Sequence, residues 1–143
     1  MSNLRNQIIE EARSWIGTPF SHQGHIKGYK IDCVSLAREL GVKFNILDTV
    51  IKPEYIGYSR RPDRNKLKQA CEDYLVSIPF SQLLPADLLL IQFEVEPAHI
   101  AIYNIDTIIH ASTRFKKCDE HPFSEFWKLK VTNCYRYPGL VNE

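Results

Sequence analysis

Apolar residues in the first half of the chain recur with the period of an amphipathic helix. The spacing predicts a first helix over residues 4–16, which Gly17 ends, and a second over residues 33–41, which Gly41 ends. A third stripe of apolar residues at helical spacing covers residues 67–75. The first half of the chain is therefore expected to be mainly helical.

The pattern changes from helical to extended after Pro85. Residues 20–30 and 45–63, between the helices, carry glycine or proline and are expected to be loops. Helices first and antiparallel strands afterwards is the order of an α+β fold, with N-terminal helices packed on a small antiparallel sheet. No repeat or linker divides the chain, so we expect a single domain over residues 1–143. The predicted strands cover residues 87–92, 98–103, 107–111 and 131–137.

Composition narrows the class of protein without choosing a function. The 143 residues are enough for one domain with one core. A formal net charge of +1 gives no reason to expect nucleic acid or a membrane surface as a partner. The N-terminus has no apolar run of the signal-peptide type, so we expect synthesis in the cytoplasm without an export signal.

The four cysteines lie far apart in the sequence and form no CxxC pair. This spacing favours free thiols over disulfides or a zinc ribbon. Cys118 and His121 resemble half of a zinc site, but no second pair stands at zinc spacing. We therefore expect neither a metal nor a cofactor.

Cys33 differs from the other cysteines because it is predicted in the first turn of a helix. The unpaired N–H groups and the positive end of the helix dipole stabilise a thiolate there, and they lower the thiol pKa from its usual value of about 8.5. A lone cysteine is more often a small core residue, and that role fits Cys71. Two hypotheses therefore stand for Cys33, a nucleophile and a packing residue.

A cysteine nucleophile needs a base, and two of the histidines lie on neighbouring predicted strands. His99 and His110 belong to the predicted hairpin AHIAIYNIDTIIHAS. If Tyr103 lies opposite Asp106 or Ile108, both imidazoles leave the same face of the sheet. An odd loop places them on opposite faces unless a bulge restores the parity.

Several short motifs follow one another in the order seen in a known family. GTPF and SHQG, then IDCVSLARE, PADLLL, AHIAIY and IIHAS, and a closing CYRYPGL resemble the NlpC family of cell-wall cysteine peptidases, most of all its phage-associated branch. The resemblance extends from about Ile16 to Leu140. It implies a papain-like fold in which the helix of Cys33 lies against the sheet that carries both histidines.

The resemblance also implies a catalytic role for each matched residue. Cys33 matches the nucleophile of the family, and His99 matches the base that takes and returns the proton. His110 matches the third polar residue, which orients the base and selects its tautomer. The backbone N–H of Cys33 would meet the oxyanion.

Three further residues are expected to contact the substrate. Many members of the family have a tyrosine where this chain has Phe20, which has no hydroxyl to offer the oxyanion. His22 is close enough in the sequence to substitute for that hydroxyl. Asp32 precedes the nucleophile and is also a candidate helix N-cap.

The function implied by the resemblance is hydrolysis of an amide bond in peptidoglycan stem peptides, near D-glutamate and a diamino acid. Because no export signal is visible, we expect a phage or prophage tail to deliver the enzyme to the cell wall, with tail proteins as partners. Two alternatives stand beside this one. The chain could be an inactive tail-associated binding module of the same fold, or Cys33, His99 and His110 could hold a zinc ion.

Overall fold

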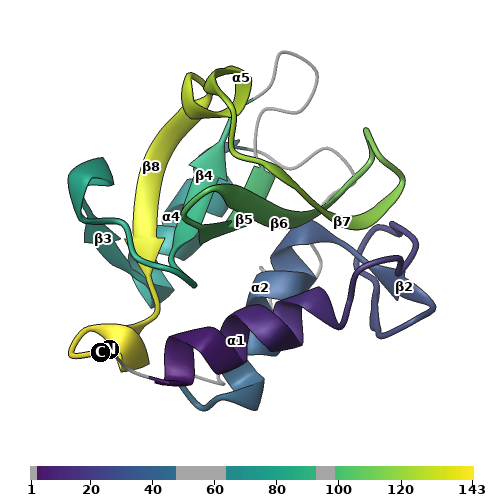
Figure 1. Cartoon of the computed structure of the whole chain (residues 1–143), viewed down its shortest axis with the longest axis horizontal. Coiled ribbons are helices and arrows are strands. Elements are labelled where there is room, and N and C mark those ends of the chain that lie inside the picture. The colour runs from purple at the N-terminus through teal and green to yellow at the C-terminus, as the bar shows by residue number, and fades with distance from the viewer. Residues whose placement is uncertain (1–2, 48–63, 93–98) are drawn as a thin grey trace.

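The computed structural model describes residues 3–47, 64–92 and 99–143 (Figure 1). Helices precede most of the strands, so the α+β order predicted from the apolar pattern is confirmed. In chain order the elements are α1 (Asn3–Arg13), β1 (His25–Ile26), β2 (Lys30–Ile31), α2 (Cys33–Lys43), α4 (Arg64–Tyr74), β3 (Val76–Ile78), η1 (Phe80–Gln82), β4 (Leu88–Ile91), β5 (His99–Asn104), β6 (Thr107–Ser112), β7 (Lys117–Pro122), α5 (Glu125–Lys128), β8 (Val131–Arg136) and η2 (Pro138–Leu140).

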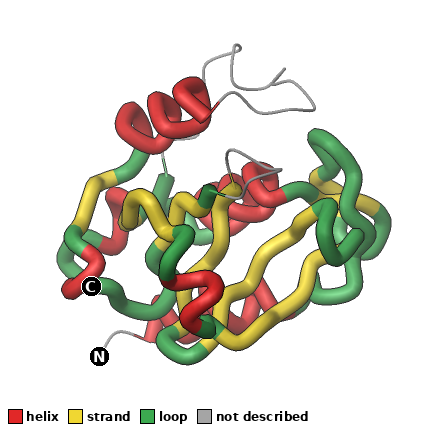
Figure 2. The backbone as a smooth tube through the Cα atoms, turned by 90° about the horizontal axis from the view of Figure 1, so that it is seen from above, coloured by secondary structure: helices red, strands yellow, loops and turns green. Residues whose placement is uncertain are grey.

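The strands of the described residues form one main sheet and one small hairpin. The main sheet has six strands in the order β3-β8-β4-β5-β6-β7, and each neighbouring pair is antiparallel. β1 and β2 pair only with each other. Every residue of β4 is buried, which explains why its sequence, LLLI, is continuously apolar. Figure 2 shows α4 at the periphery, beside the edge strand β3.

The main sheet separates two apolar clusters. On one face α1 and α2 pack against the strands, with Leu36 and Leu40 of α2 in the same cluster as Ile100 of β5. The other face carries a second cluster that includes Phe123 and Trp127, from the segment around α5. Both faces of the central strands are therefore covered.

The second helix is longer than its sequence predicts. It continues through Gly41 and ends at Lys43. A Cβ atom on Gly41 would lie 2.7 Å from the Cβ of Leu47 and 3.0 Å from the ring of Tyr137. The glycine lets these side chains approach the helix closely, and it does not end it. The first helix is shorter than predicted, because it ends at Arg13.

Four strands are absent from the sequence-based prediction. β3 and β7 are edge strands, and β7 has the mostly polar sequence KCDEHP with Cys118 as its buried residue. β1 and β2 lie within the predicted loop of residues 20–30. Edge strands need only one buried face or none, so their sequences lack the apolar alternation that reveals central strands. Most of the predicted loop over residues 45–63 lies outside the described residues.

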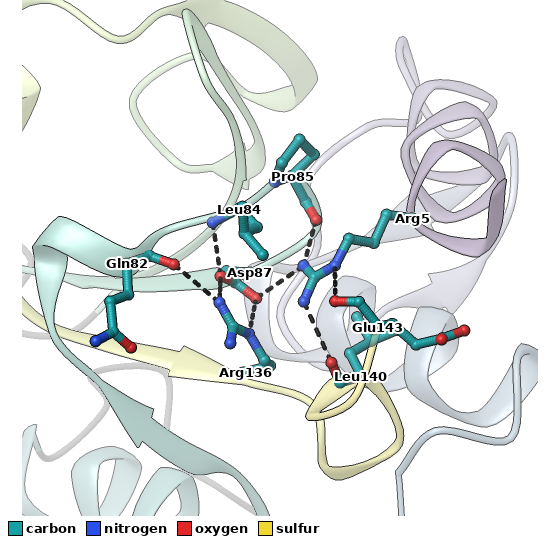
Figure 3. A network of polar contacts seen from close by, with 8 residues as sticks. All are labelled: Arg5, Gln82, Leu84, Pro85, Asp87, Arg136, Leu140 and Glu143. Atoms are coloured by element: carbon teal, nitrogen blue, oxygen red, sulfur yellow. Dashed lines mark hydrogen bonds and ion pairs between the residues drawn. The ribbon is translucent and has the colours of Figure 1, made fainter. Parts of the chain in front are cut away.

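A buried ionic network fastens the two ends of the chain to the sheet (Figure 3). Asp87, immediately before β4, is fully buried and binds two guanidinium groups. Arg5 Nη1 lies 3.1 Å from Asp87 Oδ1, and Arg136 donates through Nε and Nη2 over 2.9 and 2.8 Å. The N–H of Leu84 donates to Asp87 Oδ2. Arg5 also donates to the carbonyl of Leu140, so the network joins α1, β4, β8 and the C-terminal segment.

Across the three described ranges, the helices are all too short or too polar to cross a membrane.

Candidate active site

Cys33 is the first residue of α2, the position predicted for a thiol at a helix start. Asp32 is the N-cap of this helix, and its Oδ1 accepts a hydrogen bond from Ser35 N at 2.8 Å. Its Oδ2 accepts from Gln23 N at 2.6 Å, so one carboxylate fixes both the helix start and the loop before it. All four cysteines are free thiols, as predicted, and Cys33 is the one that is only partly buried.

The loop before α2 is fastened to the edge of the main sheet. Pro19 pairs with Lys117 of β7, and Phe20 pairs with Ile31 of β2. Gly24 lies so close to the β2 backbone that a Cβ there would stand 2.7 Å from Ile31 N. The start of α2 is therefore held beside the β6–β7 end of the sheet by backbone contacts.

The β5–β6 hairpin brings the two predicted catalytic histidines together. Tyr103 pairs with Ile108 across a two-residue turn, which is one of the even registers that place both imidazoles on one face. His99 Nε2 lies 2.7 Å from His110 Nδ1, the distance of a short hydrogen bond. The register therefore selects the arrangement in which both side chains share a face, which the sequence alone left open.

Both imidazoles are withdrawn from solvent, with 2% of His99 and 1% of His110 exposed. Burial lowers the pKa of each ring well below its usual value of 6.5, and for His110 the neighbouring rings of His99 and His121 lower the pKa further. Both rings are therefore neutral near pH 7. A neutral imidazole carries one N–H, so the tautomer of each ring decides which one donates in the bond between them.

The histidine pair lies on the sheet face opposite α2. Side chains alternate along β5, so that Ile100 and Ile102 belong to the cluster of α2 and Ala101 to the cluster of Trp127. His99 has the parity of Ala101, and it is the first residue of β5. The thiol of Cys33 and the ring of His99 therefore start on opposite sides of the sheet, and they can meet only around the N-terminal end of β5.

The residues predicted to contact substrate all lie before or at the start of α2. Phe20 is half-buried against the helix-side core, and its N–H donates to Lys116 O. His22 is half-buried in the same loop. Asp32 is 3% exposed and acts as the N-cap of α2, the structural role that its position before the helix predicts. Substrate contact by these three residues stays a prediction.

Three aromatic residues surround His110, and none of them was assigned to the site from the sequence. The ring centroids of Trp127, His121 and Phe115 lie 5.0, 5.1 and 5.9 Å from that of His110. The equal spacing of eleven residues from His99 to His110 and from His110 to His121 is the signal that could have found one of them. Two successive hairpins of similar length bring such residues together, but β7 is not recognisable as a strand.

An apolar cavity of about 240 Å³ lies beside α2. Val34 and Ser35 of the first helical turn line it, together with apolar side chains of α4, β4 and β5. Arg38 adds a guanidinium to the wall. The thiol helix thus has an apolar hollow along one side.

Metal ligation was the second alternative for the three candidate catalytic residues. Over the residues that the structure describes, no group of three His, Cys, Asp or Glu side chains is placed to hold a metal ion. His99 and His110 instead bind each other through ring nitrogens.

The thiol helix and the antiparallel sheet that carries both histidines define a papain-like α+β fold, as predicted. No family model and no curated protein matches the sequence. The fold is similar to that of an NlpC/P60 family protein from Bacillus cereus, with a TM-score of 0.65 and 16% identity over 93% of this chain and 40% of that one. It is also similar to the NlpC/P60 domain of the peptidoglycan hydrolase SagA, with a TM-score of 0.60 and 18% identity over 92% of this chain and 97% of that one.

A third similar structure is the peptidoglycan hydrolase RipB from Mycobacterium tuberculosis, with a TM-score of 0.60 and 15% identity over 94% of this chain and 64% of that one. The chain spans about two fifths of the length of the Bacillus cereus protein and nearly all of the SagA domain. The chain therefore has the NlpC/P60 fold, which its motifs predicted. Its place in a phage-associated branch stays a prediction.

Proposed function

We propose that this chain is a cysteine endopeptidase that hydrolyses an amide bond in peptidoglycan stem peptides. The observation that carries the proposal is the 2.7 Å bond between His99 and His110 in a fold whose thiol helix begins with Cys33. The substrate class rests on the motifs and on structural neighbours that are peptidoglycan hydrolases.

The first chemical step is proton transfer from the thiol of Cys33 to His99. His99 binds His110 through Nε2, so the proton goes to Nδ1. His99 begins β5, and the thiol reaches its ring past the end of that strand. The positive end of the α2 dipole stabilises the thiolate that forms.

The thiolate then attacks the scissile carbonyl, and the carbonyl oxygen becomes an oxyanion. The N–H groups of the first turn of α2 lie next to the sulfur, and the N–H of Cys33 would donate to this oxyanion. His99 returns its proton to the amine as the C–N bond breaks, which leaves a thioester on Cys33. His99 then removes a proton from a water molecule, which attacks the thioester carbonyl. The C–S bond breaks, the peptide leaves as a carboxylic acid, and His99 returns the proton to the sulfur of Cys33.

Substitution of Cys33 tests the proposal directly. Cys33→Ala should lower turnover by about 10⁴-fold or more and leave peptide affinity nearly unchanged, because the thiol acts in the bond-breaking step. The measurement is digestion of purified stem peptides with mass analysis of the fragments, paired with a binding titration. Cys134→Ala removes a buried thiol in the second cluster and should keep cleavage.

The histidines should differ from each other in the same assay. His99→Ala should lower turnover by about 10²–10⁴-fold because the base is lost. His110→Ala should lower it by less, because a misoriented base still works part of the time. A His110→Ala variant with unchanged turnover would leave Cys33 and His99 as a dyad.

Two results would replace the proposal with an alternative. Wild-type protein that binds stem peptides and never cuts them would favour an inactive binding module. Stoichiometric metal that is lost together with activity on chelation would favour the zinc hypothesis. Delivery by a phage or prophage tail is the part of the proposal that rests on the sequence alone.

A further inference from the structure

The ring of His110 has one nitrogen whose surroundings are unusual. Its Nδ1 faces His99, whereas its Nε2 points away from that bond and is buried without a hydrogen-bond partner. His110 itself is 1% exposed. A buried polar nitrogen of this kind needs an explanation, because a buried group without a partner loses its hydration and gains no hydrogen bond in return.

Three rings from separate parts of the chain surround this histidine, and we call Phe115, His121 and Trp127 the aromatic cage. Phe115 lies between β6 and β7, His121 lies on β7, and Trp127 lies on α5. The planes of His121 and Trp127 stand at 83° and 88° to the plane of His110, and Phe115 stands at 66°. Phe115 and His121 also pack on each other, with centroids 4.1 Å apart.

Register explains why His121 belongs to the cage. His110 pairs with Asp119 across the β6–β7 ladder, and His121 is two residues further along β7. Residues two apart on a strand share a face, so His121 lies diagonally across from His110 on the histidine face. Nε2 of His121 is likewise buried without a hydrogen-bond partner.

The tautomer of His110 decides whether His99 can be the base. The bond between the two rings holds one proton, because both imidazoles are neutral. If His110 donated that proton from Nδ1, the only proton of His99 would sit on Nδ1, where the thiol proton has to arrive. If His110 carries its proton on Nε2, His99 donates from Nε2 and keeps a lone pair on Nδ1.

A ring that stands across the plane of His110, as Trp127 and His121 do, discriminates between these two tautomers where its face meets Nε2. The face of an aromatic ring is electron-rich and accepts an N–H, but it repels a lone pair that points at it. We propose that the aromatic cage of Phe115, His121 and Trp127 holds the His110 proton on Nε2 and thereby keeps His99 Nδ1 ready for Cys33. The catalytic consequence rests on the proposed function, whereas the tautomer can be measured without any activity. The cage residues are positioning residues, since they act through His110.

Nitrogen NMR of the whole chain with ¹⁵N-labelled histidine tests the proposal. The Cys33→Ala background removes the thiol that could protonate His99, and His→Gln variants assign the signals. At neutral pH, Nε2 of His110 should resonate as a protonated nitrogen and its Nδ1 as an unprotonated one. The opposite pattern at His110 would overturn the proposal, and this measurement needs no change in the cage.

A matched pair of substitutions in the cage gives the second readout. Trp127→Leu removes the ring face and should shift His110 toward the Nδ1–H tautomer, while Trp127→Phe should keep the wild-type pattern. With Cys33 present, Trp127→Leu should lower kcat on the order of tenfold with little change in KM, and Trp127→Phe should recover most of the loss. Phe126→Leu is the control, because Phe126 is exposed and contacts the ring of Trp127 without belonging to the cage.

The outcomes separate this inference from the proposed function. A folded Trp127→Leu variant with an unchanged His110 tautomer would overturn the role of the cage even if the wild type cleaves peptide. If His110 has the expected tautomer but the wild-type chain never cleaves peptide, the role of the cage is supported and the proposed peptidase activity is rejected.

Discussion

The reactivity of each thiol is set by its immediate surroundings. Burial raises the pKa of Cys71 and of Cys118 to about 12, and that of Cys134 to about 11. Nearby acidic groups, such as Glu72 beside Cys71, raise these values further. Cys33 has the opposite setting, since it is partly exposed at the positive end of a helix dipole.

We therefore expect Cys33 to be the reactive thiol of the folded chain. At neutral pH the three buried cysteines have a thiolate fraction of about 10⁻⁴ or lower, which makes them slow nucleophiles. Limiting iodoacetamide followed by peptide mapping should label Cys33 first, and the unfolded chain should label at all four positions. Equal labelling of Cys71 or Cys134 in the folded protein would contradict the expectation.

At the scale of elements, the β5–β6 hairpin aligns the two histidines, and its turn contains a residue in an unfavourable backbone conformation. Ile105 adopts a φ of 60°, in the left-handed region that a β-branched residue rarely occupies. Glycine or asparagine is the usual residue at such a turn position. The register of the flanking strands holds Ile105 in this conformation, and with it the alignment of His99 and His110.

Relieving this turn should stabilise the protein. Ile105→Asn should raise the free energy of unfolding by about 1 kcal/mol, because asparagine tolerates positive φ and the isoleucine side chain is 55% exposed. Ile105→Val keeps the branched Cβ and should give no gain. Urea denaturation of the two variants checks this, and equal midpoints would show that the turn is not strained.

At the scale of the whole molecule, the Asp87 network ties together segments that are far apart in the sequence (Figure 3). Its carboxylate lies between the guanidinium groups of Arg5 and Arg136, at 0% exposure. Hydrogen bonding to Asp87 raises the pKa of Arg136. The buried Arg5 and the partly buried Arg136 depend on one anion, so removing that anion is more costly than breaking an exposed pair.

Asp87→Asn should therefore lower the free energy of unfolding by about 3–5 kcal/mol. Asparagine has nearly the same shape, so the loss reports the missing charge and not a cavity. Glu10→Gln is the control, because it removes an exposed ion pair with Arg13 and should cost no more than about 1 kcal/mol. A thermal or urea unfolding series compares the two variants, and similar losses would show that the network contributes little.

The sequence by itself determined the features that depend on near neighbours in the chain. The apolar spacing around Leu36 and Leu40 and the capping aspartate Asp32 define the start of α2, and they place Cys33 in its first turn. The apolar runs of β4 and β5 mark buried central strands. Helix period, capping and strand alternation are local properties, so they can be read without the fold.

The tertiary structure alone decided the features that depend on residues distant in the sequence. The sequence left the parity of His99 and His110 open, and the register of the hairpin chose it. Gly41 looks like a helix end in the sequence, but its role is to admit the ring of Tyr137. His121 lies beside His110 because β7, a polar edge strand, pairs with β6. Packing and pairing at a distance set these features, since the same local pattern is compatible with more than one partner.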